Sequence, residues 1–495
     1  MTIRWAAVLL VGLAVEAHAQ SPDQILKRHA DAIGGKKALE AIATTTVTGR
    51  VRAPDGRTGT FTQYSTRAGR LRVDVSLGEA QWRWGFNGRA VWQSDRRDGL
   101  RTLAGEAAAR VRAEASCALA CGGPVDGDRR AFFVGRDRVG SRPVLVMDAV
   151  MPGGFSHTLS FDAETYLLLK QEEHSKAGTD IRSYGDYRRV DGVMEPHEVE
   201  WQRDGETFLI SVDRVTHNAA VDDAVFAFGP RPAGEALPSM TDLLLAVRRN
   251  QETLESLVQS YIYTHTRTDR DIDAKGRVTK EDVQVFEVFH LAGLPVRTVV
   301  QRNGQPLSAK ESRQQRERVD GIVRDYEKQK RRADAGGPPV RLNNVLPRGV
   351  PTSDRYISSL LRMCEFSNLR RERFGERTMI VAEFEPRRGL STNSPLEAQM
   401  SKAAGAMWID EQGRQVVRTD SFYREDDGMT GKGTRTTSEQ VRLNDEVWLL
   451  SQAELNVVWK LFFGKTVHRQ TTFHQSDYKK FNVESDYKIG SASTP

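Results

Sequence analysis

Short segments in which apolar and polar residues alternate recur along most of this chain, and they constrain the fold more than any other feature. Such period-two alternation is typical of antiparallel strands that bury one face of a sheet. Asn87-Gly88, a strong hairpin-turn pair, follows one such segment, and Val91-Trp92 opens the next. The clearest apolar positions before that turn are Leu71, Val73, Val75, Trp82, Trp84 and Phe86.

The strand-rich pattern is interrupted at residues 229–239 by a stretch rich in Pro and Gly. Helix-start residues stand at the beginning of each part: Ser21-Pro22-Asp23 in the first, and Ser239 with Asp242 in the second. A length of 495 residues also exceeds that of one ordinary domain. We therefore predict an N-terminal domain at 20–228, a linker at 229–239 and a C-terminal domain at 240–495. The expected fold class is α+β and β-dominated, with two tandem, strongly curved antiparallel sheets (half-barrels), each with a leading helix and covering helices.

A loose internal repeat agrees with two related halves. Residues 160–164 match residues 408–412, and each segment precedes a predicted strand. Residues 184–189 also echo residues 475–480, although this second element stands at a different place in each half. The pattern favours a duplicated architecture over one large unit.

The first twenty residues have the features of a secretory signal. A short basic start precedes an apolar run from Trp5 to Val15, and the small residues Ala17 and Ala19 follow at the positions that favour cleavage. We expect a signal peptide at 1–19 and a periplasmic protein. The apolar run is shorter than the roughly 20 residues that span a bilayer. We expect no transmembrane segment in the mature chain.

Composition excludes several classes of function. Hydrophobic residues make up 39% of the chain and charged residues 28%, a balance that does not suit an integral membrane bundle. The 72 basic and 66 acidic side chains leave a net charge of +6, which is a small excess for this length. A dedicated nucleic-acid binder concentrates far more positive charge, so nucleic acid is not an expected partner.

Three cysteines do not make a disulfide framework. Cys117 and Cys121 lie four residues apart at the end of a helix predicted over 104–120. They make a possible disulfide if the helix unwinds at the following glycines, and otherwise they stay reduced. Two thiols without a nearby His or further Cys do not form a metal site, and Cys364 is expected to be a buried free thiol.

A second helix is predicted from Ser308, which Glu311 caps, to Ala333. It carries nine basic and five acidic residues and lacks a wide apolar stripe, so we expect it to be largely solvated. Its basic end, at 328–332, either forms an ordinary charged surface or contacts anionic lipid headgroups.

The motifs of common catalytic classes do not occur. The sequence lacks a Gly-x-Ser-x-Gly elbow, a phosphate-binding Gly-x-x-x-x-Gly-Lys loop and a His-Glu-x-x-His pair. The adjacent carboxylates Glu172 and Glu173 are interpreted as part of a turn with nothing to raise a pKa. We therefore expect no enzyme, no catalytic residues, no metal and no cofactor.

Aromatic residues on the predicted strands leave two interpretations open. Trp82, Trp84 and Phe86 project to one face, and Trp448 and Trp459 give the second half a similar content. They are either packed core under the helices or the lining of a concave apolar cavity for a lipophilic ligand, together with Leu71, Val73 and Val75.

Three groups of residues in the first half carry a family resemblance. Residues 25–40 with the Thr-rich segment that follows, Phe86–Trp92 and Tyr184–Met194 resemble the outer-membrane lipoprotein-sorting proteins related to the carriers LolA and LolB. Trp408–Asp410, Asn444–Leu449 and Ser476–Phe481 make the second half similar to the same group. The resemblance implies an incomplete β-barrel, closed by helices, whose apolar cavity holds lipoprotein acyl chains.

Together these observations predict a periplasmic, non-catalytic carrier or sorting protein for lipid or lipoprotein acyl chains. One alternative is a structural scaffold of the cell envelope that binds a protein partner. Another is the accessory region of an exported peptidase without its catalytic domain. A carbon-lined cavity favours the carrier over the scaffold, and a convergent acid–base cluster would favour the peptidase.

Overall fold

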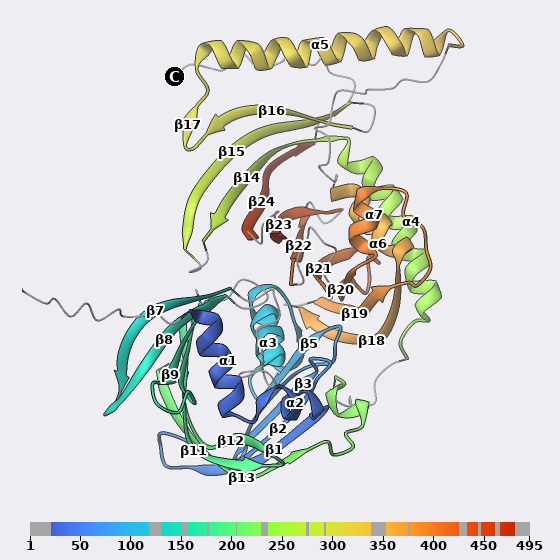
Figure 1. Cartoon of the computed structure of the whole chain (residues 1–495). Helices are drawn as coiled ribbons and strands as arrows, with labels where there is room; N and C mark the ends of the chain where they lie inside the picture. The colour runs from blue at the N-terminus through green and yellow to red at the C-terminus, as the bar shows by residue number, and fades with distance from the viewer. Residues whose placement is uncertain are drawn as a thin grey trace, which may run out of the picture.

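The computed structural model describes residues 21–117, 130–150, 156–175, 178–203, 205–228, 236–273, 277–291, 294–337, 353–374, 377–424, 433–443, 447–460 and 466–480. They form two large antiparallel sheets that do not close into barrels (Figure 1). This arrangement confirms the predicted α+β, β-dominated fold. The predicted signal peptide, Cys121 and most of the linker lie outside the described residues, as does the side chain of Cys117.

The first half contains one sheet, which has thirteen strands among the described residues, and three α-helices. Its elements are α1 (Pro22–Ala32), α2 (Gly35–Ala41), β1 (Thr44–Arg52), β2 (Thr58–Thr66), β3 (Leu71–Leu77), β4 (Ala80–Phe86), β5 (Val91–Asp95), β6 (Gly99–Leu103), α3 (Gly105–Cys117), β7 (Arg130–Val139), β8 (Arg142–Val150), β9 (Ser156–Asp162), β10 (Leu168–Ser175), β11 (Gly178–Val190), β12 (Val193–Arg203), β13 (Glu206–His217) and the short 3-10 helix η1 (Asp223–Phe226).

The second half contains a sheet of eleven described strands and four α-helices. Its elements are α4 (Met240–Val258), β14 (Tyr261–Ile272), β15 (Val278–Leu291), β16 (Leu294–Arg302), β17 (Gln305–Pro306), α5 (Ala309–Asp334), α6 (Ser353–Met363), β18 (Cys364–Phe374), β19 (Arg377–Pro386), α7 (Pro395–Met400), β20 (Ala403–Asp410), β21 (Val416–Tyr423), β22 (Arg435–Leu443), β23 (Val447–Lys460) and β24 (Thr466–Lys480).

Both sheets follow the same path. In each, the chain enters at a central strand, runs as a meander to one edge, passes through a helical segment to the opposite edge, and returns by a second meander. In the first sheet α3 makes the passage from β6 to β7, and β13 ends beside β1. In the second sheet α5 and α6 lead from β17 to β18, and β24 ends beside β14. The shared topology agrees with a duplicated architecture.

One of the two sequence repeats marks equivalent places in the sheets, and the other does not. Asp162 ends β9 and Asp410 ends β20, the third strand from the same edge of each sheet. Asp162 pairs with Arg142, the first residue of β8, at 2.8 Å, and Asp410 pairs with Arg377, the first residue of β19, at 2.7 Å. The Asp-Tyr element instead lies on β11 in the first half and on β24 in the second, which are not equivalent strands.

Local signals in the sequence explain how the helices begin. The Ser21 hydroxyl accepts a hydrogen bond from the Gln24 amide at 3.2 Å, and Ser308 and Glu311 form a reciprocal capping box at the start of α5. Ser239 caps α4 through the Asp242 amide at 3.1 Å. The hairpin predicted at Asn87-Gly88 joins β4 to β5.

The sequence missed four strands and two helices: β6, β7, β17, β18, α6 and α7. Helix α6 buries Ile357, Leu360 and Met363 at helical spacing against the second sheet, and α7 adds Met400 to the same core. Several helices therefore cover the second sheet. Cys364, at the start of β18, is a buried free thiol as predicted, and burial raises its pKa to about 12.

The two halves meet through the β4–β5 hairpin and the β18–β21 part of the second sheet. Strands β19 and β20 are buried on both faces, since α6 and α7 cover one face and the first half contacts the other. Ala90 packs into a cluster with Met379 and Val381, and the Phe86 ring lies 5.7 Å from that of Phe422. It remains a prediction that each half folds independently when the chain is divided at the linker.

None of the helices in the described part of the chain combines the length and the apolar character that crossing a membrane requires.

Candidate functional site

A cavity of about 890 Å3 lies on the concave face of the first sheet, inside the curve where α1 and α3 are placed (Figure 1). Side chains from α3 and from strands of both meanders line it. Arg96 and Arg97, on the β5–β6 turn, line the cavity although their side chains are 74% and 92% exposed. The cavity therefore opens to solvent beside this turn.

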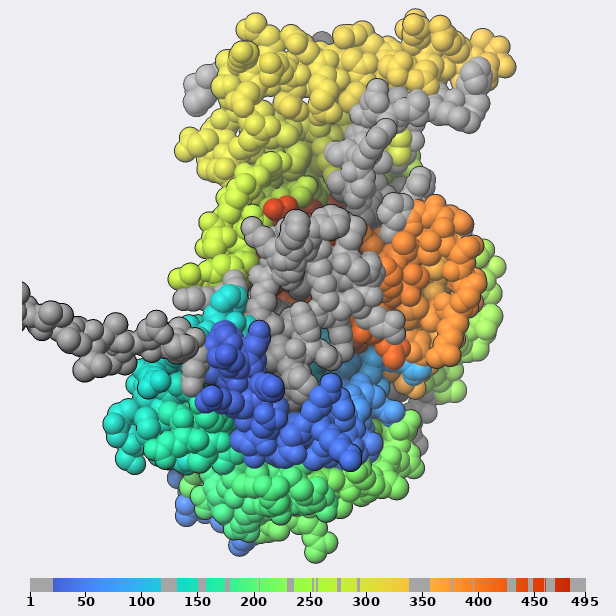
Figure 2. Space-filling view, in the orientation of Figure 1, coloured from blue at the N-terminus to red at the C-terminus, as the bar shows by residue number. Residues whose placement is uncertain are grey.

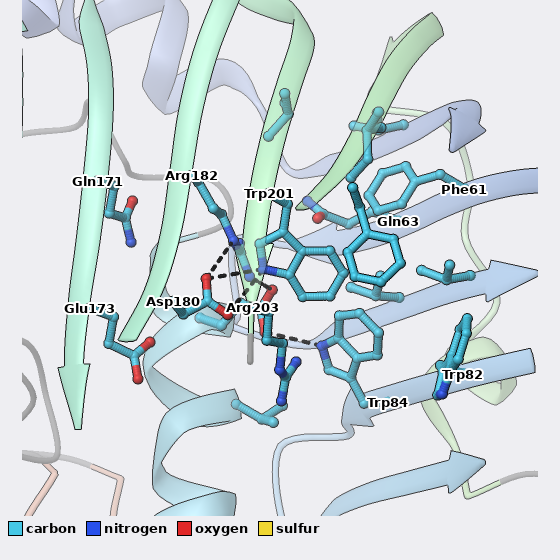
Figure 3. A pocket seen from close by; sticks show the side chains of 18 of the residues that line it. Phe61, Gln63, Trp82, Trp84, Gln171, Glu173, Asp180, Arg182, Trp201 and Arg203 are labelled. Carbon is cyan, nitrogen blue, oxygen red and sulfur yellow. Dashed lines mark hydrogen bonds and ion pairs between the residues drawn. The ribbon is translucent and has the colours of Figure 1, made fainter. Parts of the chain in front are cut away.

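One side of the cavity is an aromatic wall. Phe61, Trp82, Trp84 and Trp201 belong to it (Figure 3), and Phe208 completes it. The Trp84 and Trp201 ring centroids lie 5.9 Å apart, and those of Trp201 and Phe208 lie 5.6 Å apart. Trp82 and Trp84 share a face because they are two residues apart on β4. A wall of this kind offers a large apolar contact surface to a bound molecule.

Aliphatic side chains continue the aromatic wall. Val73 and Val75 on β3 stand opposite Trp84 and Trp82 on β4, and all four line the cavity. Val47 and Val199, from β1 and β12, are partly buried and line it as well. This part of the lining has the apolar character that a hydrocarbon chain requires.

The opposite end of the cavity is polar, and its charged groups pair with one another (Figure 3). Glu114 of α3 accepts hydrogen bonds from the Trp84 indole at 3.0 Å and from the Arg182 guanidinium at 2.8 Å. Both carboxylate oxygens of Asp180 accept from the Trp201 indole, at 3.0 and 3.1 Å. The indole N–H groups of Trp84 and Trp201 thus connect the aromatic wall to the carboxylates of the polar end.

A second ion pair connects α3 to β10. The Arg110 guanidinium donates to Glu173 at 2.5 Å, and the His157 ring lies 3.8 Å from the same carboxylate. Burial raises the pKa of Glu173, and the nearby Asp180 carboxylate adds to the rise against the opposing effect of Arg110. The prediction that Glu173 lies in a turn with an ordinary pKa was therefore wrong. Glu173 belongs to a strand and faces the cavity.

Arg182 shows the opposite balance. Burial by itself would lower the pKa of its guanidinium, but the carboxylates of Glu114 and Asp180 raise that pKa well above its usual value. Arg182 therefore stays charged inside the cavity. The Arg182 guanidinium also lies 5.7 Å from the centre of the Trp201 ring, a cation–π contact.

The eight residues predicted to line a cavity divide into two groups. Val73, Val75, Trp82 and Trp84 lie on the cavity surface. Leu71 and Phe86 belong to the same buried core as Val73, Val75 and Trp84 but do not line the cavity, and Leu71 has no exposed surface. Register explains this, because Leu71 and Phe86 pair at the far end of the two strands, where Phe86 contacts the second half.

Trp448 and Trp459 do not line this cavity, which belongs to the first half. Trp448 is buried between the halves in the cluster that contains Trp408 and Ala90. Trp459 lies on β23 with the Arg469 guanidinium 5.5 Å from its ring. The packing of Trp448 favours the core interpretation for that residue, and a ligand-lining role for Trp459 stays a prediction.

Sequence reasoning missed the polar end of the cavity and Trp201. Asp180, Arg182 and Tyr184 alternate on β11, and all three line the cavity. Their period-two spacing was visible, but charged residues in a strand are ordinarily assigned to the solvent face. One signal was available: Arg182 pairs with Trp201 on the neighbouring strand β12, so a large aromatic residue lies beside the charged ones.

His217, next to the cavity, links the pH to the stability of the first half. Its Nε2 lies 3.1 Å from Glu195, which lines the cavity, and its Nδ1 lies 3.4 Å from Asp191. The hydrogen bond with Glu195, aided by both carboxylate charges, raises the pKa of His217 despite burial. Protonation of His217 therefore stabilises the folded state.

We expect His217→Gln to remove a contribution of about 1 kcal/mol that depends on pH. Because the pKa is raised on folding, this contribution is fully present below the unfolded value of about 6.5 and is lost as the pH rises through the folded value. Urea unfolding should give a larger difference between parent and variant at about pH 5.5 than at about pH 8.5. An equal difference at the two pH values would contradict the assignment.

No known protein family matches the chain, and no curated protein sequence matches it. Among solved structures, it is similar to a DUF1329 family protein from Desulfovibrio piger, with 10% identity, a TM-score of 0.30, and coverage of 42% of this chain and 98% of that one. It is also similar to a LolA superfamily protein from Nitrosomonas europaea, with 16% identity, a TM-score of 0.29, and coverage of 41% and 97%.

A likeness over a greater length is found to MucB in the MucA/MucB complex of Pseudomonas aeruginosa. It covers 91% of this chain and 94% of that one, with 10% identity and a TM-score of 0.18. All three likenesses are distant, at 16% identity or less.

Proposed function

We propose that the first half binds an amphipathic lipid or the acyl chain of a lipoprotein in its cavity, without catalysis, and that the protein is a periplasmic carrier or sorting protein. The observation that supports this is a cavity of about 890 Å3 with an aromatic wall and a polar end. The volume lies within the range of ligand sites, about 300–1,000 Å3. The N-terminal pattern at 1–19 supports export.

The two ends of the cavity suit the two parts of such a ligand. The wall of Trp82, Phe61 and Phe208 fits a hydrocarbon chain, and the paired charges around Arg182 and Glu114 fit a polar head. An acyl chain of about 14 carbons, at about 0.8 kcal/mol per buried CH2, gains about 11 kcal/mol. Lost translational freedom costs at least about 4 kcal/mol. The difference corresponds to a dissociation constant in the micromolar range.

The cavity also bears on the alternatives. A scaffold that binds only through its surface has no need of an open space with an aromatic wall. The charged cluster is the kind of feature that would favour an enzyme, but its carboxylates are engaged: Glu114 by Arg182 and Trp84, Asp180 by Trp201, and Glu173 by Arg110. Paired in this way, they support a structural and recognition role.

Filling the cavity tests the proposal. In Val47→Trp a large ring replaces a partly buried side chain of the cavity lining, whereas Val134→Trp places the same ring at a site on β7 that is 52% exposed. Isothermal titration with myristate and with a synthetic diacyl lipopeptide should show micromolar binding to the parent chain. We expect the dissociation constant to rise about tenfold or more in Val47→Trp and to stay unchanged in the control variant.

Two results would overturn the proposal. One is the absence of any heat of binding or change of tryptophan emission with either ligand. The other is binding that is equally strong in Val47→Trp, which would place the ligand outside the cavity. Native mass spectrometry of the protein purified from envelope extracts gives a further measurement, because a lipid adduct should be present in the parent and lost in Val47→Trp.

A further inference from the structure

Helix α5 forms one end of the molecule, on the side away from the first half (Figure 1). It has 26 residues, and of these only Val319 is fully buried. Val319, Ile322 and Val323 pack on a small cluster around Phe289 and Val296 of the second sheet. The opposite face of the helix is open to solvent along its length (Figure 2).

The open face of α5 carries a basic stripe. Taking Val319 as the centre of the buried face, a repeat of 3.6 residues per turn places eight exposed charged residues on the far side. Six of them are basic, and Glu317 and Asp325 are acidic. The basic stripe consists of Lys310, Arg313, Arg324, Lys328, Arg331 and Arg332.

The acidic residues of α5 lie mainly toward its flanks. Glu311 pairs with Arg302 of β16 at 3.5 Å, away from the stripe. Within the stripe, Arg331 has a long contact of 4.0 Å with Glu327, and both side chains are more than half exposed. Among the described residues, Arg313, Arg324 and Lys328 have no ion-pair partner. An ordinary solvated helix mixes the two signs of charge evenly on its open face, whereas basic residues outnumber acidic ones six to two on the open face of α5.

We propose that α5 docks the protein on a lipid bilayer that contains anionic headgroups, with the basic stripe facing the membrane surface. At 1.5 Å per residue the helix is about 39 Å long, and the stripe residues form two groups along it, at 310–313 and 324–332, on the same face, so a flat surface can meet both groups. The stripe carries no large apolar side chain, so it binds by charge at the level of the headgroups without inserting into the hydrocarbon. Charge complementarity supports an anionic surface as the occupant.

Vesicle sedimentation with the full chain tests this surface. We compare vesicles of phosphatidylcholine alone with vesicles of phosphatidylcholine and phosphatidylglycerol. The protein should sediment only with the anionic vesicles, and it should be released at about 1 M salt, where the Debye length is about 3 Å. Vesicles of both kinds offer acyl chains, so a difference between them reports the headgroup charge and is independent of the cavity.

A matched pair of triple variants locates the binding. Arg324→Gln with Lys328→Gln and Arg332→Gln removes three charges of the basic stripe. The control Lys37→Gln with Arg52→Gln and Arg136→Gln removes three exposed charges of the first half. Since each basic side chain near an anionic surface adds about 1 kcal/mol, the stripe variant should lose about a hundredfold in partition coefficient and the control less than about threefold. Both should keep the melting temperature of the parent.

Three outcomes would overturn the proposal. The first is that the protein does not bind the anionic vesicles at low salt, which would leave an acidic protein as the partner of the stripe. The second is that the stripe variant binds as tightly as the control variant. The third is that the protein sediments equally with both kinds of vesicle, which would assign binding to acyl chains.

Discussion

Replacing Arg370 with alanine is expected to destabilise the protein by about 3–5 kcal/mol, because it leaves two buried carboxylates without their charged partner. Arg370 lies on β18 and has no exposed surface. Its guanidinium donates to Glu372 at 2.8 Å and to Glu383 at 2.6 Å, and these side chains are 5% and 1% exposed. In Arg370→Ala both ion pairs are lost, and water cannot reach the two carboxylates to solvate them.

The same cluster holds the two halves together. Thr102, on the edge strand β6 of the first sheet, donates its backbone N–H to Glu372 at 2.9 Å, and its hydroxyl accepts from Arg370 at 3.0 Å. Asn87, in the β4–β5 hairpin, donates to Glu383 at 3.0 Å. We therefore expect Arg370→Ala also to weaken the contact between halves, so that urea unfolding changes from one transition toward two.

Two further variants make this prediction specific. Arg50→Ala breaks an ion pair with Asp213 whose side chains are 73% and 51% exposed, and it should cost less than about 1 kcal/mol. Arg370→Met combined with Glu372→Gln and Glu383→Gln removes all three charges and should recover part of the loss. A loss in Arg370→Ala no greater than in Arg50→Ala would show that the cluster is open to water.

The cluster also bears on the predicted independence of the two halves. Fragments 20–230 and 239–495 should each fold if the sheets are self-sufficient. The second fragment would then expose Glu372 and Glu383, which in the whole chain accept hydrogen bonds from Thr102 and Asn87 of the first half. We expect this fragment to be the less stable of the two. Fragments without any cooperative unfolding would contradict the division at 229–239.

Much of the fold could be predicted because its signals are local. The Asn87-Gly88 turn, the Ser308–Glu311 capping box and the alternation from Leu71 to Phe86 each specify a structure within a few residues. The resemblance between residues 160–164 and 408–412 likewise identified equivalent strand ends, because an Asp at that position pairs with an Arg that begins the neighbouring strand.

What the sequence did not show are inward-facing charges. Arg370 and Glu372 alternate on β18 as solvent-facing residues would, and this strand was missed. Asp180 and Arg182 alternate in the same way on β11, and the polar end of the cavity was missed with them. In both cases the partners come from distant segments, such as Glu383 for Arg370 and Glu114 for Arg182. Local periodicity cannot reveal a partner that only the tertiary structure brings near.

The two tryptophans of β4 should respond differently to replacement by alanine, which separates the core and cavity interpretations that the sequence left open. Trp84 is 8% exposed, packs against Trp201 and donates its indole N–H to Glu114. Trp84→Ala should therefore cost about 3–5 kcal/mol of stability. Trp82 is only partly buried and lies on the cavity surface, so Trp82→Ala should cost about 1 kcal/mol.

Ligand binding should rank the same two variants by a different criterion. Trp82→Ala removes apolar contact worth about 1 kcal/mol, so it should weaken acyl-chain binding about fivefold while the protein stays folded. Trp84→Phe keeps an aromatic ring but removes the indole N–H together with part of the ring volume, while Glu114 still accepts from Arg182. It should cost more than the roughly 1 kcal/mol of the lost hydrogen bond and less than Trp84→Ala. Urea unfolding and isothermal titration measure the two effects separately. If Trp82→Ala lost several kcal/mol of stability without any change in binding, both tryptophans would be core and the aromatic wall would not face a ligand.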